Sequence, residues 1–166
     1  MDPTLLIEAE KQLATLPPAA QQKVGMLIAE ARRTATREMS KNNFMAYVRY
    51  VWPGFIHGRH HEKMAEAFQR VAEGKTKRLI INMPPRHTKS EFASYLLPSW
   101  FLGNFPGKKI IQTSHTAELA VGFGRKVRNL VNSDRYKDIF PDVALQADSK
   151  AAGRWATNYA GEYFAI

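Results

Sequence analysis

The segment that most constrains this chain is an apolar run that ends at two prolines and is followed by a short polar loop. Residues 79–83 form the apolar run, residues 84–85 are the prolines, and residues 89–90 are a Lys-Ser pair that leads into a helical pattern. Strand, loop and helix in this order are typical of a phosphate-binding loop. The order predicts that the rest of the chain is arranged around a site for an anion.

The chemistry of this loop suits phosphate, although its sequence departs from the usual pattern. Only Lys89 and Ser90 match G-x-x-x-x-G-K-[ST], because Met83 and Thr88 stand at the two glycine positions. A helix N-terminus offers free N–H groups and the positive end of its dipole. Lys89 adds an ammonium for β/γ phosphates, and Ser90 adds a hydroxyl for Mg²⁺. Arg86 adds a guanidinium that can bind phosphate oxygens in a fork.

Residues 84–90 read Pro-Pro-Arg-His-Thr-Lys-Ser and resemble the Walker A loop of the large terminase subunit of tailed bacteriophages. The usual form in that family is Pro-Pro-Arg-His-Gly-Lys-Ser. The similarity runs from about Phe44 to Ile166 and includes three further segments, 60–62, 78–83 and 113–120. The departure is Thr88, because a β-branched residue tolerates positive φ poorly. We therefore expect an ordinary φ at Thr88, or weakened nucleotide binding.

The resemblance implies a site for ATP and Mg²⁺ on the loop. Its cofactor-binding residues would be Pro84, Pro85, Arg86, His87, Thr88, Lys89 and Ser90. Lys89 would bind the β/γ phosphates, Arg86 would stabilise charge on the γ-phosphate, and Ser90 would hold the metal. The family's adenine-binding segment lies upstream of this loop, which makes His60 and His61 further candidates for nucleotide contact.

Residues 41–58 are rich in aromatic side chains, most of which we expect in the core. His57, His60 and His61 superficially resemble a metal cluster. Zinc sites need a fuller set of ligands, and Glu62 is the one obvious partner nearby in sequence. Contacts to adenine or to the protein itself are therefore the favoured roles of His60 and His61.

The net charge of +9 is unevenly distributed. Residues 1–40 hold five basic and five acidic residues, so the whole excess lies from Lys41 onward. A basic surface attracts nucleic acid without sequence preference. Arg125, Lys126 and Arg128 are the candidate DNA contacts, and a solvated basic surface is the alternative.

The periodicity of apolar residues predicts a series of helices and strands. The expected helices cover residues 4–16, 19–39, 61–73, 89–102 (kinked at Pro98) and 117–131, the expected strands cover 79–83, 108–114 and parts of 155–166, and residues 133–151 are expected to form a loop. This alternation predicts an α/β fold, with a mostly parallel sheet of the P-loop NTPase type and flanking helices. An N-terminal helical hairpin, residues 1–40, would precede the partial ATPase domain, residues 41–166.

Residues 114–116, Ser-His-Thr, follow the expected strand 108–114. Ligands bind at this end of parallel strands. Serine or threonine at this position also caps a following helix. The sequence leaves the two roles open.

Within this sequence, no apolar strand ends in two acidic residues. In the terminase family such a strand supplies the water-orienting carboxylate and the second Mg²⁺ ligand that phosphoryl transfer needs. We therefore interpret the chain as a truncated, N-terminal piece of the motor, without its nuclease domain and without hydrolytic activity of its own.

The resemblance implies an ATPase that drives double-stranded DNA into a procapsid, with genome cleavage by the nuclease domain. Its partners would be the portal protein, the small terminase subunit and further copies in a ring, in the host cytoplasm at the procapsid portal. The absence of cysteine, of an N-terminal signal and of a long apolar run predicts a protein that is neither secreted nor membrane-bound. A helicase-like motor and a basic DNA-binding module with a decayed nucleotide site remain alternatives.

Overall fold

The structure is a computed structural model that describes residues 7–8, 11–13, 15–148 and 151–166. The chain divides into two compact units, Met1–Met39 and Ser40–Ile166. Among the described residues, no helix is both long enough and apolar enough to cross a membrane.

The first unit contains most of a long helix, α2 (Pro18–Asn42). Pro18 suits the first helical position, because its missing N–H would have no partner there and its φ is already helical. The predicted helix 19–39 is therefore confirmed. The predicted helix 4–16 lies partly outside the described residues; residues 7–8 and 11–13 are helical, whereas residues 15–16 form a turn and a bend.

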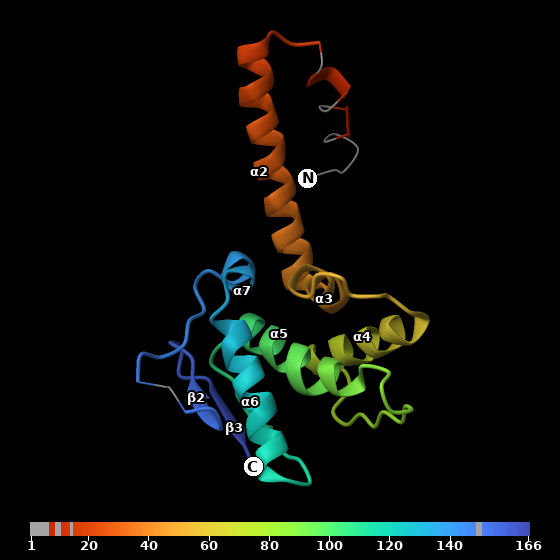
Figure 1. The fold of residues 1–166 in the computed structure, drawn as a ribbon, viewed down its shortest axis with the longest axis vertical. Helices are drawn as coiled ribbons and strands as arrows, with labels where there is room; N and C mark the ends of the chain where they lie inside the picture. The colour runs from red at the N-terminus through yellow and green to blue at the C-terminus, as the bar shows by residue number, and fades with distance from the viewer. Residues whose placement is uncertain (1–6, 9–10, 14, 149–150) are drawn as a thin grey trace. The chain divides into compact units, whose positions relative to one another are not determined.

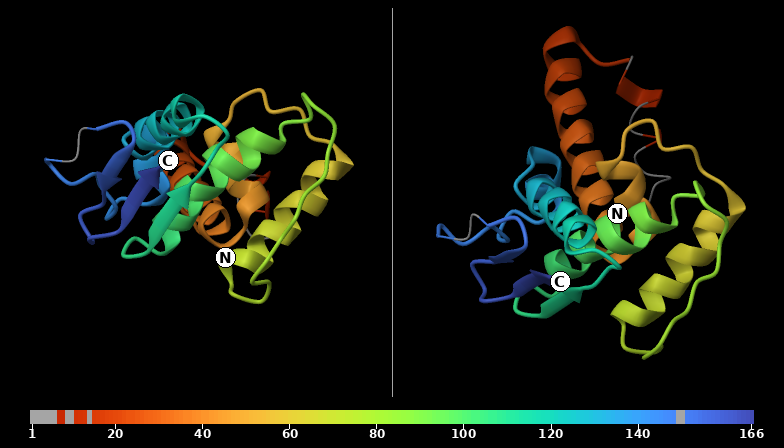
Figure 2. Two further views of the ribbon diagram at one scale, coloured as in Figure 1. Left: turned by 90° about the horizontal axis from the view of Figure 1, so that it is seen from below. Right: turned by 60° about the horizontal axis from the view of Figure 1, so that its bottom comes forward.

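The second unit consists mainly of helices (Figures 1 and 2). In chain order these are α3 (Phe44–Val51), α4 (Arg59–Ala72), the π-helix η1 (Glu91–Leu96), α5 (Leu97–Asn104), α6 (Ala117–Val131) and α7 (Asp134–Ile139). The predictions of helices at 61–73, 89–102 and 117–131 are confirmed, the last with identical bounds. The chain is helical without a break from Lys89 to Asn104. Its π-helical stretch ends two residues before Pro98, which cannot donate a helical hydrogen bond.

The sheet has three strands in the order β1-β3-β2. β1 (Lys109–Gln112) pairs in parallel with β3 (Glu162–Ala165), with Lys109 opposite Glu162. β2 (Arg154–Ala156) pairs antiparallel with β3, with Trp155 opposite Tyr163. α6 packs against β3, and Trp155 and Tyr163 stack with ring centroids 5.1 Å apart. The predicted strands within 108–114 and 155–166 are confirmed.

The predicted fold class is wrong, because the chain is mostly helical and its sheet is small and mixed. The predicted central strand, residues 79–83, forms no regular secondary structure and belongs to no sheet. Ile81 and Met83 pack against the core, whereas the side chain of Ile80 is 85% exposed. The run is therefore buried on one side only. A continuous apolar run predicts burial on both faces, and here the run lacks the neighbouring strands that such burial requires.

The prediction of a loop over 133–151 is also wrong where α7 forms. The N–H of Tyr136 donates to the Ser133 hydroxyl (3.3 Å), which caps the helix, and Asp134 places a negative charge in its first turn. Tyr136 and Ile139 are fully buried. A recognisable cap and two core contacts thus make this short segment helical.

Aromatic side chains from α3, α4, η1 and α5 form the centre of the core. The ring of Phe44 lies 5.8 Å from Phe68, 5.9 Å from Phe92 and 5.4 Å from Trp100. The Trp100 indole N–H donates to the Ser40 carbonyl (2.9 Å). The expectation that most aromatic residues of 41–58 belong to the core is confirmed in part: Phe44 and Tyr47 are buried in it, whereas the other three are half-buried and pack against it (Tyr50, Trp52 and Phe55). This core fixes the helix that follows the loop.

Candidate phosphate-binding loop

The loop of residues 84–90 surrounds a cavity of about 520 Å³ that is lined by residues 83–91. Lys89 and Ser90 begin the helix, and the N–H of Phe92 donates to the Thr88 carbonyl (3.0 Å) to close its first turn. The first turn of a helix presents N–H groups without intrahelical acceptors. Lys89 and Ser90 also line an apolar cavity of about 420 Å³ on the side of Leu79 and Ile81. The predicted loop residues thus line one cavity, and the charged side chains of Arg86 and Lys89 are part of that lining.

Two residues of the loop have left-handed backbone conformations. Arg86 has φ = 64° and Thr88 has φ = 59°. Of the two alternatives expected for Thr88, the ordinary φ is therefore wrong, and weakened nucleotide binding stays a prediction. A left-handed conformation costs a non-glycine residue roughly 1–2 kcal/mol, and the β-branch of Thr88 adds to the crowding. The fold must supply contacts that hold the loop in this shape.

A chain of hydrogen bonds joins Thr88 to the start of α4. The Gly58 N–H donates to Nδ1 of His61 (2.9 Å), so Nδ1 carries no proton. Nε2 of His61 therefore carries the proton and donates to Oγ1 of Thr88 (2.7 Å). The Thr88 hydroxyl in turn donates to the His87 carbonyl (2.6 Å). Both views of Figure 2 show the loop passing beside the N-terminal end of α4.

The surroundings of His61 favour its neutral form. The side chain is buried, its ring stacks on Phe92 with centroids 5.0 Å apart, and Phe55 meets its plane edge-on. Burial lowers the pKa of His61, and the neighbouring His60 and His57 lower it further, while Glu62 opposes them. Neutral His61 is the form that the hydrogen-bond chain requires.

The other histidines of the site lie around the same loop. His60 is 3.8 Å from His61 and 5.8 Å from His87, measured between ring centroids. His87 Nδ1 lies 2.8 Å from the Pro85 carbonyl, and Nε2 of His57 lies 2.6 Å from the Glu62 carboxylate. The described residues contain no group of three or more potential ligands that could hold a metal ion. The structure thus brings His60, His61 and the loop together, and His61 is committed to a protein contact.

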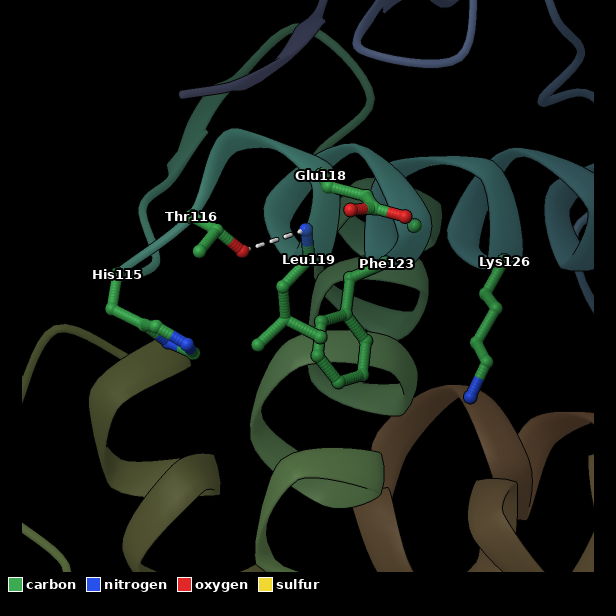
Figure 3. A pocket seen from close by; sticks show the side chains of 7 residues that line it. His115, Thr116, Glu118, Leu119, Phe123 and Lys126 are labelled. Carbon is green, nitrogen blue, oxygen red and sulfur yellow. Dashed lines mark hydrogen bonds between the residues drawn. The ribbon is translucent and has the colours of Figure 1, made fainter.

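The region after β1 forms a separate cavity of about 460 Å³. Figure 3 shows Leu119 and Phe123 side by side in it, with His115 at one end and Lys126 at the other. The Thr116 hydroxyl accepts from the Leu119 N–H (3.3 Å) and caps α6. Of the two roles open for residues 114–116, the structure assigns Thr116 to capping.

The three basic residues of α6 (Arg125, Lys126 and Arg128) have different surroundings. The ammonium of Lys126 lies 2.9 Å from the Glu91 carboxylate, directly after the loop, and above the ring of Phe123 (5.4 Å). Arg125 is exposed, and a guanidinium nitrogen of Arg128 lies 3.4 Å from the Asn129 side-chain oxygen. Arg125 and Arg128 are three positions apart and share a helix face. Lys126 is thus directed to the loop's helix, a contact that sequence spacing could not reveal.

Glu91 is a neighbour of the loop that the sequence did not predict. It lines the loop cavity, and its partner Lys126 lines the cavity of Figure 3, so this ion pair joins the two linings. The signal in the sequence was its position directly after Lys89-Ser90, in the first turn of the helix. No family model, curated protein or solved structure matches this chain.

Proposed function

We propose that this chain binds ATP with Mg²⁺ at residues 84–90, as part of the large subunit of a viral DNA-packaging terminase. The observation that carries the proposal is the loop cavity, in which Lys89 and Arg86 stand at the N-terminal end of a helix. The proposal rests on this loop and on the resemblance of residues 84–90, and it does not rest on the predicted sheet.

The residues present fit a polyphosphate. Lys89 and Arg86 supply positive charge, and the helix start supplies N–H donors for phosphate oxygens. Ser90 has an exposed hydroxyl beside Lys89 that suits a Mg²⁺ ligand. Bound ATP would supply the free energy of phosphoryl transfer, and these residues would hold its phosphates and its metal.

We assign binding, rather than hydrolysis, to the described residues. Hydrolysis needs a carboxylate that orients water. Glu91 is the one carboxylate among the residues lining the loop cavity, and it is paired with Lys126. Glu91 thus has a structural role at the start of the helix.

The charge of the chain supports double-stranded DNA as the second partner. The excess of +9 belongs to residues 41–166, which also hold the loop. Arg125 and Arg128 share one face of α6 and are the proposed phosphate contacts. The portal protein, the small terminase subunit and a ring of copies at the procapsid in the host cytoplasm are proposed on the resemblance alone.

Calorimetric binding of Mg-ATP to the wild-type chain and to Lys89→Ala tests the proposal. Removing one charge-assisted contact should weaken binding about ten- to hundredfold. Lys77→Ala is the matched control, because Lys77 is exposed and does not line the loop cavity. Equal binding by Lys89→Ala and the wild type would refute the site, and no binding by the wild type would favour a DNA-binding module without a nucleotide site.

A further inference from the structure

We propose that His61 is a positioning residue that takes over the task of the missing glycine in the loop. Glycine adopts a left-handed conformation at no steric cost, whereas Thr88 needs outside support to hold φ = 59°. The support is the hydrogen bond from Nε2 of His61 to Oγ1 of Thr88 (2.7 Å). This inference rests on the proposed function only where it concerns nucleotide affinity.

The contact acts on the loop from a rigid base. His61 is the third residue of α4, and its Nδ1 accepts the N–H of Gly58 at the cap, so one ring caps the helix and holds the loop. The ring has little freedom, since it is 4% exposed and packs against Phe55 and Phe92. Phe92 belongs to the helix that begins at Lys89. His61 therefore contacts the loop and the following helix together.

The direction of the hydrogen bonds makes the arrangement specific. Gly58 N–H can only donate, so Nδ1 of His61 must accept and Nε2 must donate. The Thr88 hydroxyl accepts a hydrogen bond from His61 and donates one to the His87 carbonyl. A valine at position 88 could neither accept nor donate. Both the β-branch that strains the backbone and the hydroxyl that holds it thus belong to the same side chain.

The backbone at Thr88 sets where the site residues point. Lys89 and Ser90 follow it directly, and the Thr88 carbonyl closes the first turn of their helix with the Phe92 N–H. A change of Thr88 to an extended conformation would redirect the chain before this turn. His61 therefore contributes to phosphate affinity through the loop, without touching the nucleotide.

A double-mutant cycle in the full chain tests the role of His61. Phenylalanine keeps a ring against Phe92 but removes both hydrogen bonds, so His61→Phe should weaken Mg-ATP binding about tenfold. In the T88G background, where no strain needs support, His61→Phe should change affinity less than about twofold. An equal effect in both backgrounds would mean that His61 serves only packing and capping, and would overturn the proposal.

A measurement without nucleotide separates this proposal from the proposed function. Nitrogen-15 NMR of the histidine side chains should find His61 with a protonated Nε2 and an unprotonated Nδ1, and Thr88→Val should shift the Nε2 signal. Thr113→Val is the control, because Thr113 is exposed and is not a member of the hydrogen-bond chain that joins Gly58, His61, Thr88 and His87. A protonated Nδ1, or an unmoved Nε2 signal in Thr88→Val, would overturn the positioning role. The expected signals in a chain that fails to bind Mg-ATP would support the positioning role and refute the proposed function.

Discussion

A buried hydrogen-bond network behind the loop allows a sharp prediction about stability. Ser99 lies on the helix that begins at Lys89, and its hydroxyl donates to the Leu96 carbonyl (2.8 Å). The hydroxyl of Tyr47 lies 2.7 Å from the Ser99 oxygen, and it must be the donor because Ser99 has used its only proton. Both side chains are fully buried. Burial raises the pKa of Tyr47 well above its usual value, so the donor stays protonated.

The two single substitutions should differ in cost. Tyr47→Phe removes the donor and leaves Ser99 bonded to Leu96, which should cost about 1 kcal/mol. Ser99→Ala leaves the Tyr47 hydroxyl buried without an acceptor, which should cost about 2–3 kcal/mol. In the double variant no hydroxyl remains to be satisfied. Its cost should therefore fall below the sum of the two single costs by about 1 kcal/mol or more.

Urea unfolding followed by circular dichroism at the helical band would measure these free energies. In a thermal scan, each 1 kcal/mol should correspond to about 2–4 °C in Tm for a chain of this size. Tyr159→Phe is the control, since Tyr159 is 50% exposed and should change stability by less than about 0.5 kcal/mol. A greater cost for Tyr47→Phe than for Ser99→Ala, or simple addition of the two costs in the double variant, would contradict this hydrogen-bond network.

Two further predictions concern pH and DNA. The pKa of His61 is lowered from 6.5 in the folded state, so the unfolded chain binds a proton first as the pH falls. The free energy of unfolding should therefore be full above about pH 6.5 and decrease below it. The urea midpoint should change less steeply with pH in His61→Phe than in the wild type, and an equal dependence on pH would contradict the lowered pKa of His61. Hydrogen bonds from Lys75 and Lys109 lower the pKa of Glu73 and Glu162 from 4.5, so their contribution is lost only as the pH falls below about 4.5, a separate window. Fluorescence anisotropy with a labelled duplex would measure how the DNA-binding constant depends on salt concentration. The slope of log binding constant against log salt should fall by about 0.9 for Arg125→Ala, and by less for a Lys126 variant because Lys126 is paired with Glu91. An unchanged slope for Arg125→Ala would remove Arg125 from the DNA contacts.

Local sequence patterns are sufficient to predict helices and strands whose caps and apolar spacing lie within a few residues of one another. The bounds of α6 follow from the Thr116 cap and the apolar spacing after it, and the structure has the same cap. β1 and α4 follow from similar local signals. The predicted fold class is wrong because residues 79–83 have no neighbouring strand to pair with. Whether an apolar run pairs in a sheet depends on distant segments of the chain and not on its own sequence alone. Here no strand pairs with the run, and Ile80 is exposed.

The loop conformation could not be predicted for a related reason. The local rule that β-branched residues avoid positive φ is sound on average, but it omits contacts from distant residues. His61 reaches Thr88 across 27 positions in the sequence. Lys126 reaches Glu91 across 35 positions. Both contacts depend on how α4 and α6 pack against the loop's helix, so they can be read only from the folded chain.

The conformation of the strained loop is energetically coupled to the packing of the buried core. Left-handed Arg86 and Thr88 store free energy that relaxed loops do not, and His61 offsets part of it. His61 in turn depends on Phe92, whose ring is also in contact with Phe44 at the centre of the core. A truncation such as Phe92→Leu, at a residue that does not line the loop cavity, should therefore loosen the loop through His61. The affinity of the loop for phosphate then depends on the packing of the helices behind it as much as on its own cations.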